Sequence, residues 1–100
     1  MAHSVTLGWS ASPDLTNPPA AGSGYNVYRS TTVGGEAAPA LNGALITSLT
    51  YIDTTVAAGQ TYDYVVTAVG VGGLESVHSN EATNVRVPIL PPTGLTATPA

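Results

Sequence analysis

The carboxylates of Asp53 and Asp63 are the groups in this sequence that come nearest to a catalytic pair. Two carboxyl groups about 5–9.5 Å apart in a cleft can hydrolyse a glycosidic bond. Asp53, however, closes a short strand-like run, and Asp63 falls on the face of its run that points away from the expected core. A domain of 100 residues with this pattern offers no deep cleft, so we interpret both groups as solvated carboxylates.

The two histidines do not form a metal-binding pattern. His3 and His78 lie far apart in the sequence, there is no cysteine, and zinc usually takes three or four Cys, His or acidic ligands. No Gly-x-Ser-x-Gly elbow, phosphate loop or acidic calcium loop is present either. We therefore expect a protein that is not an enzyme, with no catalytic, metal-binding or cofactor-binding residues and no cofactor. His3 is interpreted as a surface or tag residue.

Tyr28 is the aromatic residue best suited to meet a partner. It is out of phase with Tyr25 and Val27, so we expect it to face solvent with Val65 beside it. Two interpretations stay open. The pair forms a small apolar patch for a protein or sugar partner, or Tyr28 covers strand backbone and packs on Val65 or a loop.

The charge of the chain excludes two classes of partner. It contains two arginines, Arg29 and Arg86, no lysine and six acidic residues, for a net charge of −4. Nucleic-acid binding needs several basic side chains on one face. No apolar run approaches the roughly 20 residues needed to cross a bilayer. We expect neither nucleic-acid binding nor membrane insertion.

Alternating apolar and polar residues, separated by Gly, Pro, Asn and Ser, indicate β-strands throughout. The alternation predicts an all-β fold, a two-sheet antiparallel immunoglobulin-like sandwich. The expected strands cover residues 4–10, 24–30, 44–47 (weak), 50–54, 61–69 and 79–87. The expected inward-facing side chains are Val5, Leu7, Trp9, Tyr25, Val27, Tyr51, Val56, Tyr62, Tyr64, Val66 and Ala68.

The runs SVTLGW (4–9), GYNVYR (24–29) and GQTYDYVVTAV (59–69), followed by ES (75–76) and SNEA (79–82), together resemble a bacterial fibronectin type III domain. The resemblance covers about residues 3–88 and implies seven strands. It makes Trp9 the core tryptophan of the second strand, strand B. It makes Tyr62 a tyrosine-corner residue whose hydroxyl bonds back to the loop near Val56. The integrin-binding tripeptide Arg-Gly-Asp is absent.

The sequence departs from the family at its first strand. Domains of this family begin with a Pro-Pro-x-x-Leu-x-Ala run, strand A, which here occurs at residues 91–97, after the last strand. We therefore expect residues 1–88 to be a fibronectin type III domain that starts at strand B. Residues 89–100 would be a proline-rich linker with strand A of a next repeat.

Two alternatives remain for this carboxy-terminal segment. It is a disordered tail, or its residues Leu95 and Ala97 insert beside strand B of another copy as an added strand. Residues 88–92 reach at most about 17 Å, and a strand of about seven residues spans roughly 23 Å. The segment therefore looks too short to complete its own domain in the usual direction.

The absence of a catalytic pattern favours a non-catalytic structural spacer or protein-interaction module, and the resemblance implies that it belongs to a secreted or cell-surface bacterial protein. Its expected partners are neighbouring domains or other copies of itself, joined head to tail. The alternative is a carbohydrate-binding accessory module of a secreted carbohydrate-active enzyme, which would bind polysaccharide.

Overall fold

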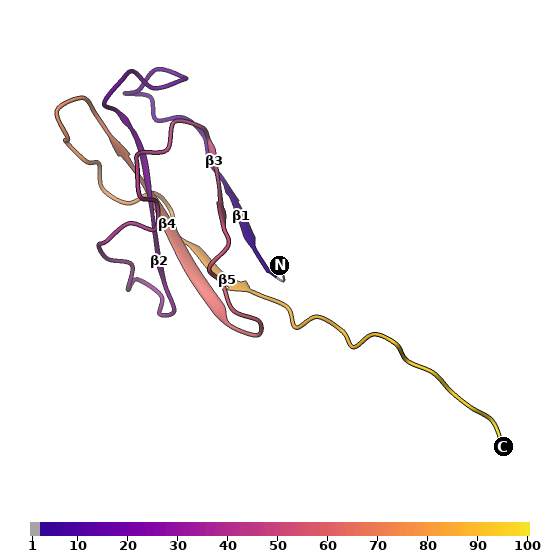
Figure 1. The fold of residues 1–100 in the computed structure, drawn as a ribbon. Coiled ribbons are helices and arrows are strands. Elements are labelled where there is room, and N and C mark those ends of the chain that lie inside the picture. Colours follow the sequence, from indigo (N-terminus) through magenta and orange to yellow (C-terminus); the bar gives the residue numbers. More distant parts are fainter. Residues whose placement is uncertain (1–2) are drawn as a thin grey trace.

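The computed structural model describes residues 3–100, and this part of the chain contains five β-strands and no helix (Figure 1). In one sheet β1 (Val5–Gly8) pairs antiparallel with β3 (Thr50–Asp53). The other sheet has the antiparallel order β2-β4-β5, formed by β2 (Gly24–Ser30), β4 (Thr61–Val69) and β5 (Ala82–Arg86). The predicted all-β sandwich of two antiparallel sheets is confirmed. The first two residues of the predicted domain, Met1 and Ala2, lie outside the described residues.

Four of the six expected strands differ from the prediction. The runs 4–10 and 50–54 are shortened to Val5–Gly8 and Thr50–Asp53, and the other two change more. The weak strand at 44–47 is reduced to an isolated bridge between Tyr25 and Ile46. A Cβ atom on Gly24 would lie 2.6 Å from the carbonyl oxygen of Ile46, so glycine permits this close approach of the two backbones.

The last strand begins at Ala82 rather than at residue 79. Before that point, Ser76 and Ser79 bond to β4 through their side chains as well as their backbones. The Ser79 hydroxyl accepts a hydrogen bond from the N–H of Val66, and the Ser76 hydroxyl accepts one from the N–H of Ala68. Because side chains take the places of backbone carbonyls, this segment lies along β4 without forming a regular strand.

The core lies between the sheets. Its buried centre is formed by Val27, Tyr62, Tyr64 and Val87. The partly buried side chains packed around it are Val5, Leu7, Trp9, Leu41, Ile46, Tyr51, Val56, Val66 and Val85. Most of the inward set predicted from alternation is present here, and Tyr25 is also buried. The residues that alternation did not predict come from loops or from the last strand, where the pattern is weak.

The carboxy-terminal segment leaves the sandwich as an extended chain. Residues 88–100 are exposed to solvent, and Figure 1 shows them running away from the strands. The start of β1 and the end of β5 lie at the same end of the sandwich, so the segment departs close to where β1 begins (Figure 1). Among residues 3–100 there is no apolar helix of membrane-spanning length.

Candidate functional site

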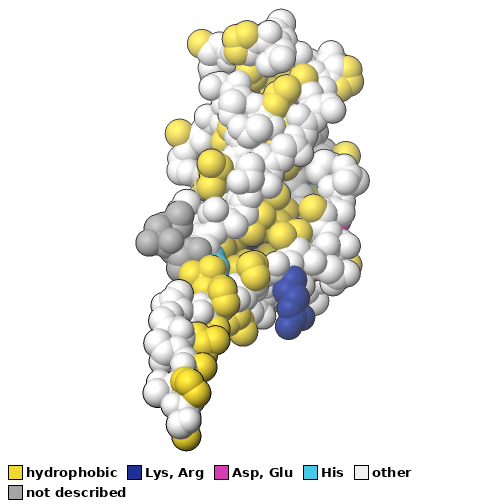
Figure 2. Space-filling view, turned by 90° about the vertical axis from the view of Figure 1, so that its right-hand side faces the viewer, with side chains coloured by type: hydrophobic (Ala, Val, Ile, Leu, Met, Phe, Trp, Pro, Cys, Tyr) yellow, Lys and Arg dark blue, Asp and Glu magenta, His cyan; other side chains and the backbone are white. Residues whose placement is uncertain are grey.

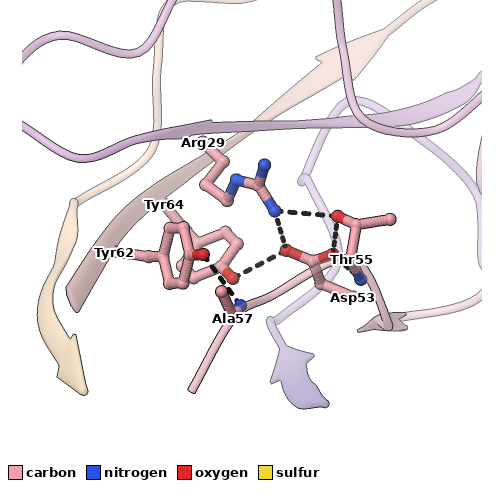
Figure 3. Close-up of polar contacts among 6 residues, drawn as sticks. All are labelled: Arg29, Asp53, Thr55, Ala57, Tyr62 and Tyr64. Atoms are coloured by element: carbon pink, nitrogen blue, oxygen red, sulfur yellow. Dashed lines mark hydrogen bonds and ion pairs between the residues drawn. The ribbon is translucent and has the colours of Figure 1, made fainter. Parts of the chain in front are cut away.

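A polar cluster joins the two sheets at the end of β3 (Figure 3). The Nη1 atom of Arg29 in β2 donates hydrogen bonds to Oδ2 of Asp53, at 2.9 Å, and to Oγ1 of Thr55, at 2.8 Å. The Tyr64 hydroxyl donates to the same Asp53 oxygen at 2.8 Å. Oδ1 of Asp53 accepts from the backbone N–H and the hydroxyl of Thr55. Every bond at this carboxylate is therefore used within the protein.

The electrostatics of this cluster oppose a catalytic role for Asp53. Burial on its own would raise the pKa of Asp53, but the hydrogen bonds from Thr55, Tyr64 and Arg29 outweigh it and hold the pKa below its ordinary value. Burial and the adjacent Asp53 raise the pKa of Tyr64. The pair is thus an ionised acceptor and a neutral donor, which is a structural arrangement.

The expectation that Asp53 and Asp63 are solvated is wrong. Their exposed fractions are 1% and 3%. Oδ1 of Asp63 accepts a hydrogen bond of 2.9 Å from the backbone N–H of Asn84, beside the irregularity in the register of β4 and β5 between Tyr62 and Tyr64. The irregularity leaves a backbone donor without a ladder partner, and the carboxylate supplies the acceptor.

Tyr62 and Trp9 occupy structural positions. The Tyr62 hydroxyl accepts a hydrogen bond of 2.9 Å from the backbone N–H of Ala57, next to Val56 (Figure 3). The Trp9 ring packs against the core and meets the Tyr25 ring edge to face, with centroids 5.6 Å apart. The Nε1 atom of Trp9 is buried and has no hydrogen-bond partner within the described residues.

The expectation that Tyr28 faces solvent is also wrong. Tyr28 is 8% exposed and Val65 is 4% exposed. The Tyr28 hydroxyl donates to the carboxylate of Glu75, which also accepts from Thr67, and its ring stacks on His78 at a centroid distance of 5.8 Å. The segment after β4 therefore covers the outer face of this sheet. Alternation alone does not reveal such a cover, because it distinguishes the two faces of a strand but not what lies over each.

Sequence reasoning gave no role to a second acidic pair. Glu36 is 7% exposed, and its Oε2 atom has no hydrogen-bond partner in the described residues. Burial and the neighbouring Glu81 raise the pKa of Glu36, while Glu81 accepts a hydrogen bond of 2.8 Å from the N–H of Gly34. Within residues 3–100, no three His, Asp or Glu side chains gather as a metal site.

The outer edge of β1 is one of the unpaired strand edges of the described sheets. β1 pairs with β3 and with no second strand of the described chain. Two hollows, of 170 and 90 Å³, lie between this edge and the segment that precedes β5. Both are lined by Trp9, Val66 and Ser79. Figure 2 looks onto the side where β1 lies and shows hydrophobic side chains in its middle and along the tail.

The two residues expected to act as a donor strand are on this tail and far from any partner within the chain. Leu95 is 93% exposed, and Ala97 is exposed as well. Gly94, before them, has a φ of 73°, a conformation that glycine adopts without strain. The structure does not bring these residues to the edge of β1 of their own molecule.

Comparison with known proteins places this architecture in a family. No family model matches the chain. A stretch of 79 residues is 42% identical to part of Exoglucanase B from Cellulomonas fimi, covering 78% of this chain and 6% of that protein. A stretch of 57 residues is 47% identical to part of Amylopullulanase from Thermoanaerobacter thermohydrosulfuricus, covering 57% of this chain and 4% of that protein. The chain thus spans a small fraction of both curated relatives.

Among the solved structures, one matching chain is similar in length to this chain. The crystal structure of an Fn3-like protein from Clostridium thermocellum aligns with a TM-score of 0.62 at 41% sequence identity. The alignment covers 88% of this chain and 80% of that one. With this identity over most of both chains, and with the sandwich of two antiparallel sheets described above, the chain belongs to the family of fibronectin type III-like (Fn3-like) domains.

Proposed function

We propose that this chain is a non-catalytic spacer or protein-interaction module of an extracellular bacterial protein that carries a carbohydrate-active enzyme domain. Residues 1–88 would form the module, and residues 89–100 a linker followed by a strand that completes another domain. The names of the two curated relatives, and the small part of each that aligns, support a place beside catalytic domains.

The proposal that the module is not catalytic rests on one observation. The two carboxylates that could have formed a catalytic pair are buried and hydrogen-bonded within the fold. Asp53 and Asp63 are buried and hydrogen-bonded to neighbouring groups. A glycosidase needs two carboxyl groups that face a sugar across a cleft. These two instead hold β2 to β3 and β4 to β5, so neither is available to a substrate.

The burial of the aromatic side chains argues against carbohydrate binding. The chain has one tryptophan, five tyrosines and no phenylalanine, and each of the six is buried or partly buried. Aromatic rings that hold a sugar must present an accessible face. Tyr28, which the sequence offered for this purpose, lies under the segment after β4. A spacer or protein-interaction role is therefore favoured over a carbohydrate-binding one.

Affinity electrophoresis tests this proposal. The full chain would be run in native gels that contain soluble cellulose derivative, starch or pullulan, and its mobility compared with that of a non-binding protein of similar size. We expect unchanged mobility in every gel and no release of reducing ends when the chain is incubated with the same polysaccharides. Concentration-dependent retardation by one polysaccharide would overturn the spacer function in favour of carbohydrate binding. Release of reducing ends would overturn the non-catalytic assignment.

A further inference from the structure

We propose that the outer edge of β1 accepts residues 91–98 of a second copy of this chain as an added antiparallel strand. This inference names a partner for the proposed interaction role. The proposed function and the strand addition can fail separately, because the polysaccharide gels that test the function do not depend on self-association.

The acceptor is an unpaired strand edge. The N–H of Trp9 donates to the carbonyl of Leu49, which continues the pairing of β1 with β3. Successive residues of a strand direct their backbone groups to alternate sides. The N–H and C=O groups of Thr6 and Gly8 therefore point to the opposite side, where the described chain provides no strand. An extended segment can pair with such a row of backbone groups.

The groove beside this edge is largely apolar, and Trp9, one of the residues that line it, carries a buried donor without a partner in the described chain. The lining of the groove also includes Leu7, Tyr64 and Val66. The buried Nε1–H of Trp9, whose side chain lines both hollows, has no acceptor in the described residues. A buried donor is normally paired, so a carbonyl brought in by an added strand would satisfy it.

The donor is the exposed tail. Leu95 and Ala97 fall on one face of an extended segment, with Thr96 and Thr98 on the other. The side chain of Leu95 is 93% exposed, so its apolar surface is available for burial against a partner. The segment also has the form of an edge strand, because it begins with two prolines and carries no charged side chain.

Geometry favours a second copy over the same molecule. The tail leaves at the end of the sandwich where β1 begins (Figure 1), so a strand antiparallel to β1 must start at the opposite end. Residues 88–92 reach at most about 17 Å, whereas the nine residues of β4 extend about 30 Å. The contact is head to tail and therefore builds dimers and longer chains.

Sedimentation velocity of the full chain over a range of concentrations tests the association. We expect the sedimentation coefficient to rise with concentration for the native sequence. Leu95→Asp should abolish the rise by placing a charge in the groove. Thr96→Asp adds the same charge on the outward face and should leave the rise intact. A strict monomer at every concentration, or equal effects of the two variants, would overturn the proposal.

Complementation tests the edge of β1. Thr6→Pro removes an outward N–H without removing a bond to β3, and Thr6→Val is its matched control. Each variant should be monomeric alone, because the Thr6→Pro chain lacks a competent edge and the Leu95→Asp chain lacks a competent tail. Their mixture should form a one-to-one dimer, because the intact tail of the Thr6→Pro chain can pair with the intact edge of the Leu95→Asp chain. An absence of dimer between two folded variants would contradict the proposal.

A synthetic peptide of residues 91–100 provides a test that does not depend on the folding of the proline variant. Trp9 is the sole tryptophan, so its fluorescence reports the groove directly. Added to the Leu95→Asp chain, the peptide should shift the Trp9 emission to shorter wavelength with saturation. The same peptide with Leu95→Asp should not. Hydrogen-exchange protection of the tail in a monomer would instead show pairing within one molecule and would overturn the swap.

Discussion

The guanidinium of Arg29 in β2 and the carboxylate of Asp53 at the end of β3 form an ion pair of 2.9 Å that joins the two sheets. The Arg29 side chain is 24% exposed and that of Asp53 is 1% exposed. The guanidinium also lies 4.7 Å from the centre of the Tyr62 ring. Arg29 is therefore a structural residue, although arginine is often found at interaction surfaces.

Replacing Arg29 with methionine should lower the stability of the domain. The change leaves the buried Asp53 carboxylate without its cation and removes the contact with the Tyr62 ring. We expect the free energy of unfolding to fall by about 2–4 kcal/mol. Urea unfolding followed by Trp9 fluorescence would measure it. Arg86→Met is the matched control, because Arg86 is exposed and its loss should change stability by less than about 0.5 kcal/mol.

Asp53 should also make stability depend on acid pH. Its pKa in the folded protein is lowered, since the hydrogen bonds from Thr55, Tyr64 and Arg29 outweigh the effect of burial. The unfolded chain therefore takes up the proton first, and the contribution of Asp53 to stability is present above the ordinary Asp pKa of about 3.9. It is lost as the pH falls through the lower, folded pKa. Unfolding measured from pH 6 down to pH 2 should show this loss, and Asp53→Asn should flatten that part of the curve. An unchanged slope in the variant would contradict the assignment.

Glu36 should have the opposite effect. Burial, together with Glu81, raises its pKa, so its contribution is most favourable below the ordinary Glu pKa of about 4.3 and is lost as the pH rises through the folded value. Glu36→Gln should therefore be more stable than the native protein at pH 7 and equal to it near pH 3. Asp14→Asn, on an exposed loop, serves as a control that should change stability by less than about 0.5 kcal/mol at either pH. Equal effects of Glu36→Gln at both pH values would count against this role.

The contribution of the Tyr62 hydroxyl to stability can be measured separately from that of its ring. Tyr62→Phe removes the acceptor for the N–H of Ala57 and keeps the ring in the core. We expect a loss of about 0.5–1.5 kcal/mol in thermal or urea unfolding. Tyr51→Phe is the control, because the ring of Tyr51 packs against the same core but its change should be smaller. If both variants lose the same stability, the bond to Ala57 is not the cause.

Tyr28 should hold the segment after β4 in place. Tyr28→Phe removes a hydrogen bond to the Glu75 carboxylate, and a bond to a charged acceptor is worth about 1.5–3 kcal/mol. We expect faster amide exchange in residues 71–79 with little change at the centre of β4, read by hydrogen-exchange mass spectrometry. Uniform acceleration across the domain would instead indicate a global loss of stability.

Local pattern was sufficient to predict the central strands and most of the core. Residues 24–30 and 61–69 are strands with the bounds that alternation indicated, and their inward tyrosines and valines form the core. Each run has a sequence period that matches the pleat, and that period depends on no distant contact.

What alternation could not predict depends on contacts between distant segments. Tyr28 and Asp63 are out of phase with the core, yet both are buried. Glu75 and His78 cover Tyr28, and the irregular pairing of β4 with β5 encloses Asp63. The link from Arg29 to Asp53 crosses between sheets. No spacing within either strand encodes it.

The shared position of the start of β1 and the end of β5 has a mechanical consequence. A pulling force applied at these two points would separate the sheets from one end and break the strand hydrogen bonds in succession. If a strand from another copy occupies the edge of β1, the load would enter that strand at the opposite end of the sandwich. Many bonds would then be sheared together. Single-molecule pulling on chains joined in this way should give higher unfolding forces than pulling on the isolated domain, so strand addition would also make the connection resistant to tension.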